Sequence, residues 1–377
     1  MDFNLTEERA LLRDMLQRFL SENYSHEERR KLLASGKAYD TSIFKELADL
    51  GIFGALFREA EGGLGGAGFD IAVVFEELGR AGVIEPILGN AVLAGGLISE
   101  LGTGEQKTLI GDVIAGQKIL AFAHTEPASR YDLNHVTATA KAGGGQITLS
   151  GTKAHVPNGA QADMIVVSAR EAGTDWDEKG ISLFLVPTDA KGVTIVDHPN
   201  VDGTSAATIR FENVVVDEGA RLGASGVAFA AIETAVARAT LAVCAEAVGA
   251  MEAAKALTIE YLKERKQFGI AIGKFQALQH RMADLLIEVE QARSAVINLA
   301  GHLEAPRALR ERHVSATKNL IGRAGALVAE ETVQLHGGIG MTDEYALSHF
   351  ARRIVMIDHL FGDVDHHLER FISLNAA

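Results

Sequence analysis

The stretch VAFAAIETAVARATLAVCAEAVGAMEAAKALTIEYLKERKQFG, residues 227–269, is the longest helical pattern in the chain. It is rich in alanine and contains no proline, and the basic residues before Gly269 suit the negative C-terminal end of a helix. It extends over roughly 40 residues, whereas the mean helix has about 12. Further helical patterns follow at about 275–302, 307–335 and 344–373. Together they predict a C-terminal four-helix bundle domain over residues 223–377.

The residues before this bundle follow a different period. Between residues 117 and 222, short β-branched segments are separated by Gly, Asn, Asp and Pro. The segments are KILAFAHTE, HVTATAKA, GQITLSGTKAHV, DMIVVSAR, ISLFLVPT, VTIVDH and TIRFENVVV. They predict a middle antiparallel β domain, either a sandwich or a barrel.

Residues 1–116 predict an N-terminal helical domain. NLTEERALLRDMLQRFL has a capping residue at Asn4 or Thr6, acidic residues in its first turn and apolar residues at helical spacing. DTSIFKELADLGIFG repeats this logic and stops at Gly51. The glycine-rich segment REAEGGLGGAGFD then reads as a flexible connection or as the wall of a ligand pocket. The fold class expected is therefore an α+β multidomain protein, helical at both ends.

Composition narrows the possible partners. Apolar residues make up 47% of the 377 residues, which is enough for a large core. The net charge of −14 argues against nucleic acid as a main partner. The single cysteine, Cys244, lies among small apolar residues and excludes an intramolecular disulfide, which fits a reducing cytoplasm. Neither a signal peptide nor a membrane-spanning stretch is expected from the pattern.

Two C-terminal motifs carry a specific resemblance. ERKQFGIAIGKFQALQHRMADL (264–285) and QLHGGIGMTDEY (334–345) resemble the two bundle signatures of the acyl-CoA dehydrogenase family. TEP (125–127) and LADLGIFGALFREAEGGLGG resemble its first cofactor strand and its N-terminal loop. The order of helical domain, β domain and bundle matches the same family. The resemblance covers nearly the whole chain.

The resemblance implies that the chain binds FAD and an acyl-CoA thioester. The residues it assigns to FAD are Arg265, Phe268, Gln276, Gln334, Gly337, Gly338, Thr125 and His155. An arginine at a helix end suits the pyrophosphate, and two glycines permit a close approach of the backbone to a phosphate or ribose. Gln334, Gly337 and Gly338 are expected to approach the cofactor of an adjoining subunit.

The base that the family reaction requires is missing from its usual position. An α-proton is weakly acidic, so a carboxylate base and donors to an enolate-like oxygen are needed. In much of the family the base is the Glu of a Tyr-Glu-Gly-Thr stretch, and an ungapped count from Gln334 places Phe361 there, followed by Gly362. The backbone N–H of Phe361 could still bind the thioester oxygen. In other relatives the base lies on the first bundle helix, where this chain has Ala239.

Other carboxylates are candidates for a relocated base. Glu246 lies seven residues after Ala239 on nearly the same helical face, and its alternative role is an ion pair or a buried polar contact in the bundle. Asp363 and Asp365 lie just beyond the gap, and Glu233 is a weaker candidate. His366 and His367 point about 100° apart on a helix, so no metal site is expected there.

The flavin-contacting stretches of the β domain also depart from the family pattern. Ala-Ser-Arg-Tyr-Asp stands where the family has Gly-Ala-Gly-Ser-Asp, and His155-Val156-Pro157-Asn158 stands for Trp-Ile-Thr-Asn. Pro157 has no N–H to donate. His124 and His155 either replace these contacts or are ordinary polar residues of the β domain.

Three functional readings follow. The chain is the base-lacking subunit of a heteromeric dehydrogenase, as in pimeloyl-CoA-type enzymes, or a self-sufficient homotetramer with a relocated base, or a non-catalytic assembly subunit that binds acyl-CoA. The long apolar helix indicates an oligomer, either a homotetramer or a heterotetramer with a base-bearing relative. An electron-transfer flavoprotein is the acceptor that the family implies.

Overall fold

The computed structural model describes residues 5–376, which form two compact units. Of the described residues, 5–34, 67–83 and 240–376 belong to the bundle unit, and Ser35–Gly66 and Ile84–Ala239 belong to the β unit. Helix α7 (Phe229–Glu264) belongs to both. This division by compactness does not follow the boundaries expected at residues 116 and 222, which stay predictions.

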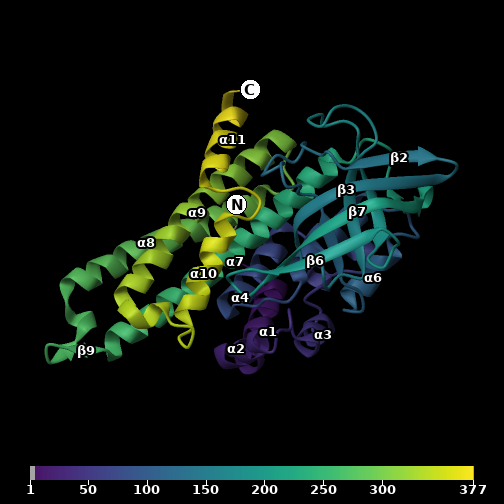
Figure 1. The fold of residues 1–377 in the computed structure, drawn as a ribbon. Helices are drawn as coiled ribbons and strands as arrows, with labels where there is room; N and C mark the ends of the chain where they lie inside the picture. The colour runs from purple at the N-terminus through teal and green to yellow at the C-terminus, as the bar shows by residue number, and fades with distance from the viewer. Residues whose placement is uncertain (1–4, 377) are drawn as a thin grey trace. The chain divides into compact units, whose positions relative to one another are not determined.

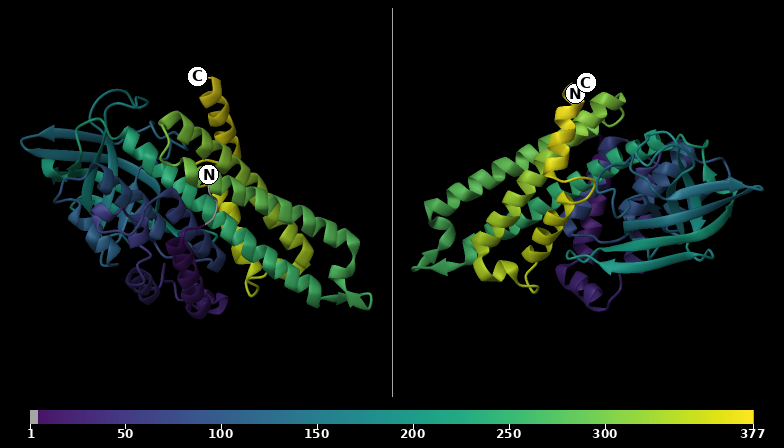
Figure 2. Two further views of the ribbon diagram at one scale, coloured as in Figure 1. Left: turned by 180° about the vertical axis from the view of Figure 1, so that it is seen from behind. Right: turned by 45° about the horizontal axis from the view of Figure 1, so that its top comes forward.

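The bundle unit is built around long helices (Figures 1 and 2). Helices α8 (Gln276–His302) and α9 (Arg307–His336) run side by side, and α10 (Leu347–Asp358) and α11 (Val364–Ala376) pack against α9. In addition to α7, the bundle unit contains the following elements: α1 (Glu7–Asn23), α2 (His26–Ala34), α4 (Gly68–Ala81), β9 (Lys266–Gln267), β10 (Ile270–Ala271), η5 (Ile272–Lys274), α8 (Gln276–His302), α9 (Arg307–His336), η6 (Gly337–Met341), α10 (Leu347–Asp358) and α11 (Val364–Ala376). The side chain of Thr6 caps α1 by accepting the N–H of Arg9, whereas Asn4 lies outside the described residues.

The last predicted helix, 344–373, is wrong as a single element. The structure divides it into α10 and α11 at a turn over residues 359–363. Phe361 has φ +59° and Gly362 has φ +118°, and neither value is compatible with a continuing right-handed helix. The sequence pattern did not show this break, because a single glycine inside a helical pattern is often tolerated.

Helices α4 and α7 cross with their backbones in close contact. A Cβ added to Gly79 of α4 would lie 2.0 Å from the carbonyl oxygen of Glu246, and one added to Gly249 of α7 would lie 1.9 Å from that of Glu76. Neither site therefore tolerates a side chain without separation of the helices. Arg293 of α8 then bridges the two helices, with contacts of 2.5 Å to Glu76 and 2.9 Å to Glu252.

The β unit contains a mixed sheet with the strand order β6-β7-β3-β2-β4-β5-β8, and β1 pairs with β4. The expected antiparallel pairing is wrong for β1, which lies parallel to β4. Strands β2 and β4 share only the pair Thr139 and Arg170, so two groups of strands are joined at one point. The strands are β1 (Leu120–Ala123), β2 (Thr139–Gly143), β3 (Gln146–Pro157), β4 (Met164–Arg170), β5 (Ile181–Pro187), β6 (Val193–Pro199), β7 (Ser205–Asp217) and β8 (Arg221–Leu222).

Short helices complete this unit. They are α3 (Thr41–Asp49), η1 (Gly54–Leu56), η2 (Glu59–Glu61), η3 (Leu88–Gly95, a π-helix), α5 (Gly96–Leu101), α6 (Thr108–Ile114) and η4 (Glu218–Ala220). Helix α3 ends before Gly51, as predicted, and Gly51 has φ +80°. The glycine-rich loop folds back against η1, because Leu64 and Gly66 donate backbone hydrogen bonds to the carbonyls of Gly54 and Ala55.

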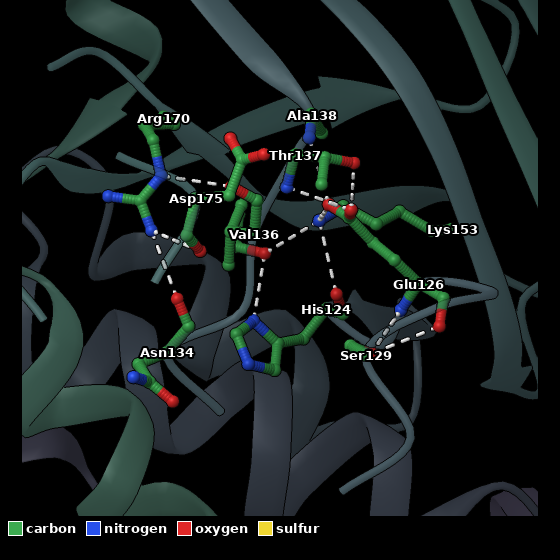
Figure 3. A network of polar contacts seen from close by, with 11 residues as sticks. His124, Glu126, Ser129, Asn134, Val136, Thr137, Ala138, Lys153, Arg170 and Asp175 are labelled. Carbon is green, nitrogen blue, oxygen red and sulfur yellow. Dashed lines mark hydrogen bonds and ion pairs between the residues drawn. The ribbon is translucent and has the colours of Figure 1, made fainter. Parts of the chain in front are cut away.

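A buried ion pair lies inside the β unit (Figure 3). Lys153 of β3 is completely buried, and its Nζ lies 2.7 Å from Oε1 of Glu126. It also donates to the carbonyl of His124 and to the Ser168 hydroxyl. Glu126 additionally accepts hydrogen bonds from the backbone N–H groups of Thr137 and Ala138. Every strong donor and acceptor of the pair is therefore engaged, as a buried charge requires.

The pair changes the ionisation of its members. Burial alone would raise the pKa of Glu126, but the charge and hydrogen bond of Lys153, with those from Thr137 and Ala138, lower it to about 2. Burial lowers the pKa of Lys153 to about 8, against the opposing effect of Glu126. Burial, with the nearby Lys153 charge, also lowers the pKa of His124 to about 3. At neutral pH this interior therefore holds one ion pair and a neutral histidine.

Helix α7 is long and apolar enough, by length and composition, to cross a membrane. However, 83% of its most apolar window is buried inside the protein, as expected of a core helix.

The glycine crossing predicts a stability change at Gly249. Gly249→Ala should lower the free energy of unfolding by about 1–3 kcal/mol, because the new methyl group overlaps the Glu76 carbonyl and outweighs the gain in helix propensity. Gly111→Ala is the matched control: this exposed position in α6 has nothing within 4 Å of an added Cβ. The control should leave stability unchanged or raise it by up to about 1 kcal/mol. Denaturant unfolding of both variants measures the difference, and equal midpoints would contradict the crossing.

The buried ion pair predicts that Glu126→Gln destabilises the protein by about 3–5 kcal/mol at pH 7, because Lys153 is left uncompensated. The folded-state pKa of Glu126 is depressed from 4.5 to about 2. Its contribution to stability is therefore complete above pH 4.5 and is lost as pH falls through about 2. The variant should accordingly lose stability less steeply than wild type across this acid window.

Glu212→Gln serves as the control for the ion pair. Glu212 and its partner Arg210 are 63% and 62% exposed, so this substitution should cost about 0–1 kcal/mol. Thermal unfolding at several pH values measures both variants. An effect of Glu126→Gln no larger than that of the control would reject the assigned importance of the buried pair.

Candidate functional site

The first bundle signature forms an exposed hairpin at the end of α7. Arg265 follows the last helical residue, and its N–H bonds to the carbonyl of Tyr261. Strands β9 and β10 pair around Phe268 and Gly269, whose φ values of +54° and +80° fit a type I′ turn. Phe268 is 91% exposed. The turn therefore presents an arginine and an uncovered aromatic ring, and Gln276 begins α8 just beyond it.

The second signature forms a glycine turn at the end of α9. Gln334, Gly337 and Gly338 are all exposed. Gly337 has φ +67°, which explains a glycine there, but Gly338 has no such constraint. Nothing lies within 4 Å of a Cβ added at Gly338. Packing within the described chain therefore does not require this glycine, which is consistent with a molecule outside the chain approaching the backbone.

An aromatic stack joins the two signatures. The ring of His336, directly before the glycine turn, lies 4.5 Å from that of Tyr261, one helical turn before Arg265. His336 Nδ1 lies 2.8 Å from the Thr332 carbonyl, and Nε2 lies 3.3 Å from the Tyr345 hydroxyl. Both signatures consequently lie at the same end of the bundle (Figure 1). An arginine, an exposed ring and open glycines fit the phosphates and adenosine of a dinucleotide.

The predicted flavin contacts in the β unit are adjacent. The N–H of Ala154 donates to the carbonyl of Thr125, so Thr125 lies beside His155. Both residues are exposed, and His155 has φ +51° within an irregular part of the β3–β7 pairing. Glu126, the residue that follows Thr125, is held by Lys153. Thr125 and His155 are therefore adjacent residues on the surface of the β unit.

His124 and Ser129 are oriented inward instead. His124 is buried, and its Nδ1 lies 2.8 Å from the Ser168 hydroxyl. The Ser129 hydroxyl accepts the N–H of Glu126 and donates to its carbonyl, which closes the turn after β1. His124 is thus a polar residue of the domain interior rather than a replacement for a flavin contact.

The turn around Phe361, to which the sequence count assigns the family base, has an unusual hydrogen-bond pattern. Its carbonyls at Asp358, Phe361, Gly362 and Val364 all accept side-chain donors. By contrast, no acceptor within the described residues takes the N–H of Phe361. A left-handed phenylalanine with an open N–H is therefore held in place by its surroundings. Such an N–H is the kind of donor that stabilises a developing oxyanion.

The candidate replacement bases are engaged in other interactions. Arg353 of α10 forms a two-pronged ion pair with Glu246, with distances of 2.6 and 2.8 Å. Asp363 accepts the N–H of His366 at the start of α11. Asp365 is exposed in the first turn of that helix, and Glu233 is buried in α7. Both carboxylate oxygens of Glu246 are occupied by the Arg353 guanidinium, which disfavours Glu246 as a free base.

Two further sequence expectations can be placed. Burial raises the pKa of the Cys244 thiol to about 12, so this thiol is an inert core group. The rings of His366 and His367 are 5.1 Å apart at 85°, and His367 points inward to the Phe361 carbonyl. No cluster of three or more metal-ligating side chains occurs within residues 5–376.

Sequence reasoning missed three charged residues that shape these sites: Lys153, Lys318 and Arg353. The alternation of buried residues along β3 could have identified Lys153 as buried, because it lies an even number of positions after the buried residues Ile147 and Leu149. A helical signal existed for Lys318, which lies on the apolar stripe with Val314 and Ile321. A charge in phase with a buried stripe indicates a buried polar network.

Comparison with family models matches the chain in three consecutive parts. Residues 6–117 match the acyl-CoA dehydrogenase N-terminal domain, residues 121–214 the middle domain and residues 226–370 the C-terminal domain. The predicted succession of helical, β and helical domains is thereby confirmed.

Individual relatives agree with the family models. The chain is 30% identical to the probable acyl-CoA dehydrogenase YngJ of Bacillus subtilis, over 99% of this chain and 98% of that protein. It is 29% identical to the caffeyl-CoA reductase–Etf complex subunit CarC of Acetobacterium woodii, over 92% of each. The crystal structure of the ChsE4–ChsE5 complex from Mycobacterium tuberculosis contains a chain with a TM-score of 0.89 and 26% identity, covering 100% of this chain and 99% of that one.

The family predicted from the two bundle signatures is therefore confirmed, together with its enzyme class and cofactor. The chain belongs to the acyl-CoA dehydrogenase family of FAD-dependent oxidoreductases that act on acyl-CoA thioesters.

Proposed function

We propose that this chain is the base-lacking subunit of a heteromeric acyl-CoA dehydrogenase. It binds FAD and an acyl-CoA thioester, and a related subunit supplies a carboxylate base. Bound FAD supplies the hydride acceptor for oxidation of the Cα–Cβ bond. Arg265, Phe268 and Gln276 hold the cofactor in this proposal, with Thr125 and His155 at the flavin and Gln334, Gly337 and Gly338 toward a neighbouring subunit.

The turn at Phe361 carries the proposal. A phenylalanine occupies the usual base position, while the turn keeps an open N–H for a thioester oxygen. Two rival carboxylates, Glu246 and Asp363, are engaged with Arg353 and with the start of α11. The chain therefore retains the donor half of the chemistry without the proton acceptor.

The proposed assembly has four chains and functions in the cytoplasm with an electron-transfer flavoprotein as acceptor. Exposed apolar side chains at the cofactor end of the bundle support an assembly, among them Phe268, Ile339 and Met341. A complex of two differently named chains among the structural relatives supports pairing with a different subunit. CarC, named as a subunit of an Etf complex, supports the acceptor.

Flavin binding should depend on Arg265. Arg265→Ala removes a charge-assisted contact worth about 1.5–3 kcal/mol, so FAD affinity should fall roughly 10- to 150-fold. Arg18→Ala is the control, because Arg18 is an exposed residue of α1 paired only with Glu22 among the described residues. Fluorescence titration of the apoprotein measures both affinities. Unchanged FAD affinity in Arg265→Ala would remove this arginine from the cofactor site.

Turnover by the isolated chain tests the missing base. Purified alone and mixed anaerobically with acyl-CoA, the wild-type protein should be yellow and should keep its flavin absorbance. Phe361→Glu should restore flavin reduction to a rate about 10- to 100-fold above that of Phe361→Gln. Glutamine has nearly the same shape as glutamate but no carboxylate to accept the proton. This range combines the usual gain from a general base with the loss from imperfect placement.

Other outcomes of this assay select another reading. Rapid bleaching by the wild-type chain would reject the missing base, and Glu246→Gln would then test whether the base is on α7. Protein that takes up no FAD would favour a non-catalytic assembly subunit. Under the proposed function, addition of a purified base-bearing relative to the wild-type chain should cause acyl-CoA to bleach the flavin absorbance.

A further inference from the structure

Lys318 is a buried cation that contacts no side-chain anion directly. It lies on α9, is fully buried, and no carboxylate within the described residues comes within ion-pair distance of its Nζ. Burial lowers its pKa, against opposing effects of Cys244, Asp358 and Asp363. Burying an ammonium group lowers the stability of the folded state unless its N–H groups donate hydrogen bonds. The acceptors of these hydrogen bonds therefore indicate the role of Lys318.

Its acceptors are two carbonyls on either side of the turn at the usual base position. Nζ lies 2.9 Å from the Asp358 carbonyl, at the end of α10, and 2.6 Å from the Gly362 carbonyl. One ammonium group therefore donates hydrogen bonds to the backbone on both sides of the turn. Hydrogen bonds to a charged donor are about twice as strong as neutral ones, so this contact dominates the turn's geometry.

Two neighbouring side chains donate further hydrogen bonds to the backbone of this turn. His367 Nε2 lies 3.0 Å from the Phe361 carbonyl, and Asn319 Nδ2 lies 2.9 Å from the Val364 carbonyl. The carbonyls on both sides of the Phe361 N–H are thus fixed, whereas that N–H has no acceptor in the described part of the chain. The left-handed φ of +59° at Phe361 is costly for a residue with a Cβ and persists because these contacts hold it.

We propose that Lys318 is a positioning residue for thioester binding: it holds the 358–362 turn so that the Phe361 N–H is set in advance for the thioester oxygen. The inference rests on the proposed function, in which this turn meets an acyl thioester. Lys318 itself acts through the backbone and touches neither substrate nor cofactor. Its contribution is preorganisation, because the turn need not rearrange when the oxygen arrives.

The test compares ligands that differ only in the carbonyl oxygen. FAD-loaded protein, in its assembled state, is titrated anaerobically with butyryl-CoA and S-butyl-CoA, and with octanoyl-CoA and S-octyl-CoA. The ratio of thioester to thioether affinity isolates the hydrogen bond to the oxygen. Wild type should favour the thioester, and Lys318→Met should reduce this preference roughly 3- to 10-fold with FAD affinity unchanged.

Two further variants separate positioning from a general packing defect. Lys318→Gln keeps amide donors at the same site and should retain more of the preference than Lys318→Met. Thr332→Val alters another buried polar group of α9, whose hydroxyl bonds only within that helix, and should keep the wild-type ratio. If Lys318→Met does not fold, Lys318→Gln against wild type decides. An uncharged amide bonds the two carbonyls more weakly than an ammonium group, so a reduced ratio supports the positioning role and an unchanged ratio overturns it.

The outcomes also distinguish a failure of this inference from a failure of the proposed function on which it rests. If wild type itself shows no preference for either thioester, the turn does not bind a thioester oxygen and the proposed function fails at this point. If wild type shows the preference and both Lys318 variants keep it in full, the proposed function stands and the positioning role is wrong.

Discussion

The bundle unit depends on the close crossing of α4 and α7, where glycines replace side chains at two reciprocal positions. Gly79 and Gly249 let the two backbones approach within reach of each other's carbonyl oxygens. This proximity brings Glu76 of α4 and Glu252 of α7 to the same arginine of α8. The ion pairs join helices that already touch, so the steric constraint comes first and the electrostatics follow from it.

Much of the fold could be predicted because its signals are local. The β-branched segments of residues 117–222 became strands, and the alanine-rich stretch from residue 227 became α7. The end of α3 before Gly51 depends only on nearby residues. The glycine turn after His336 was also predictable, since a positive φ at Gly337 is a local requirement.

The remaining features depend on contacts between distant parts of the chain. The break between α10 and α11 is held by Lys318, more than 40 positions before it, so no window of sequence shows it. Glu246 could be read as a base or as half of an ion pair until Arg353 was found beside it. The parallel pairing of β1 with β4 likewise joins segments that are separated in the chain by two other strands, β2 and β3. Local pattern identifies elements, and tertiary contacts decide the role of each charge.

The single cysteine gives the bundle an internal reporter. Cys244 is the only thiol of the chain, and it is fully buried with a pKa raised to about 12. A thiol reagent reacts with thiolate and needs physical access, so the folded core should resist modification. Labelling then proceeds only through molecules whose core has opened transiently. The rate of labelling therefore measures how often α7 is exposed, without any dye or engineered site having to be introduced.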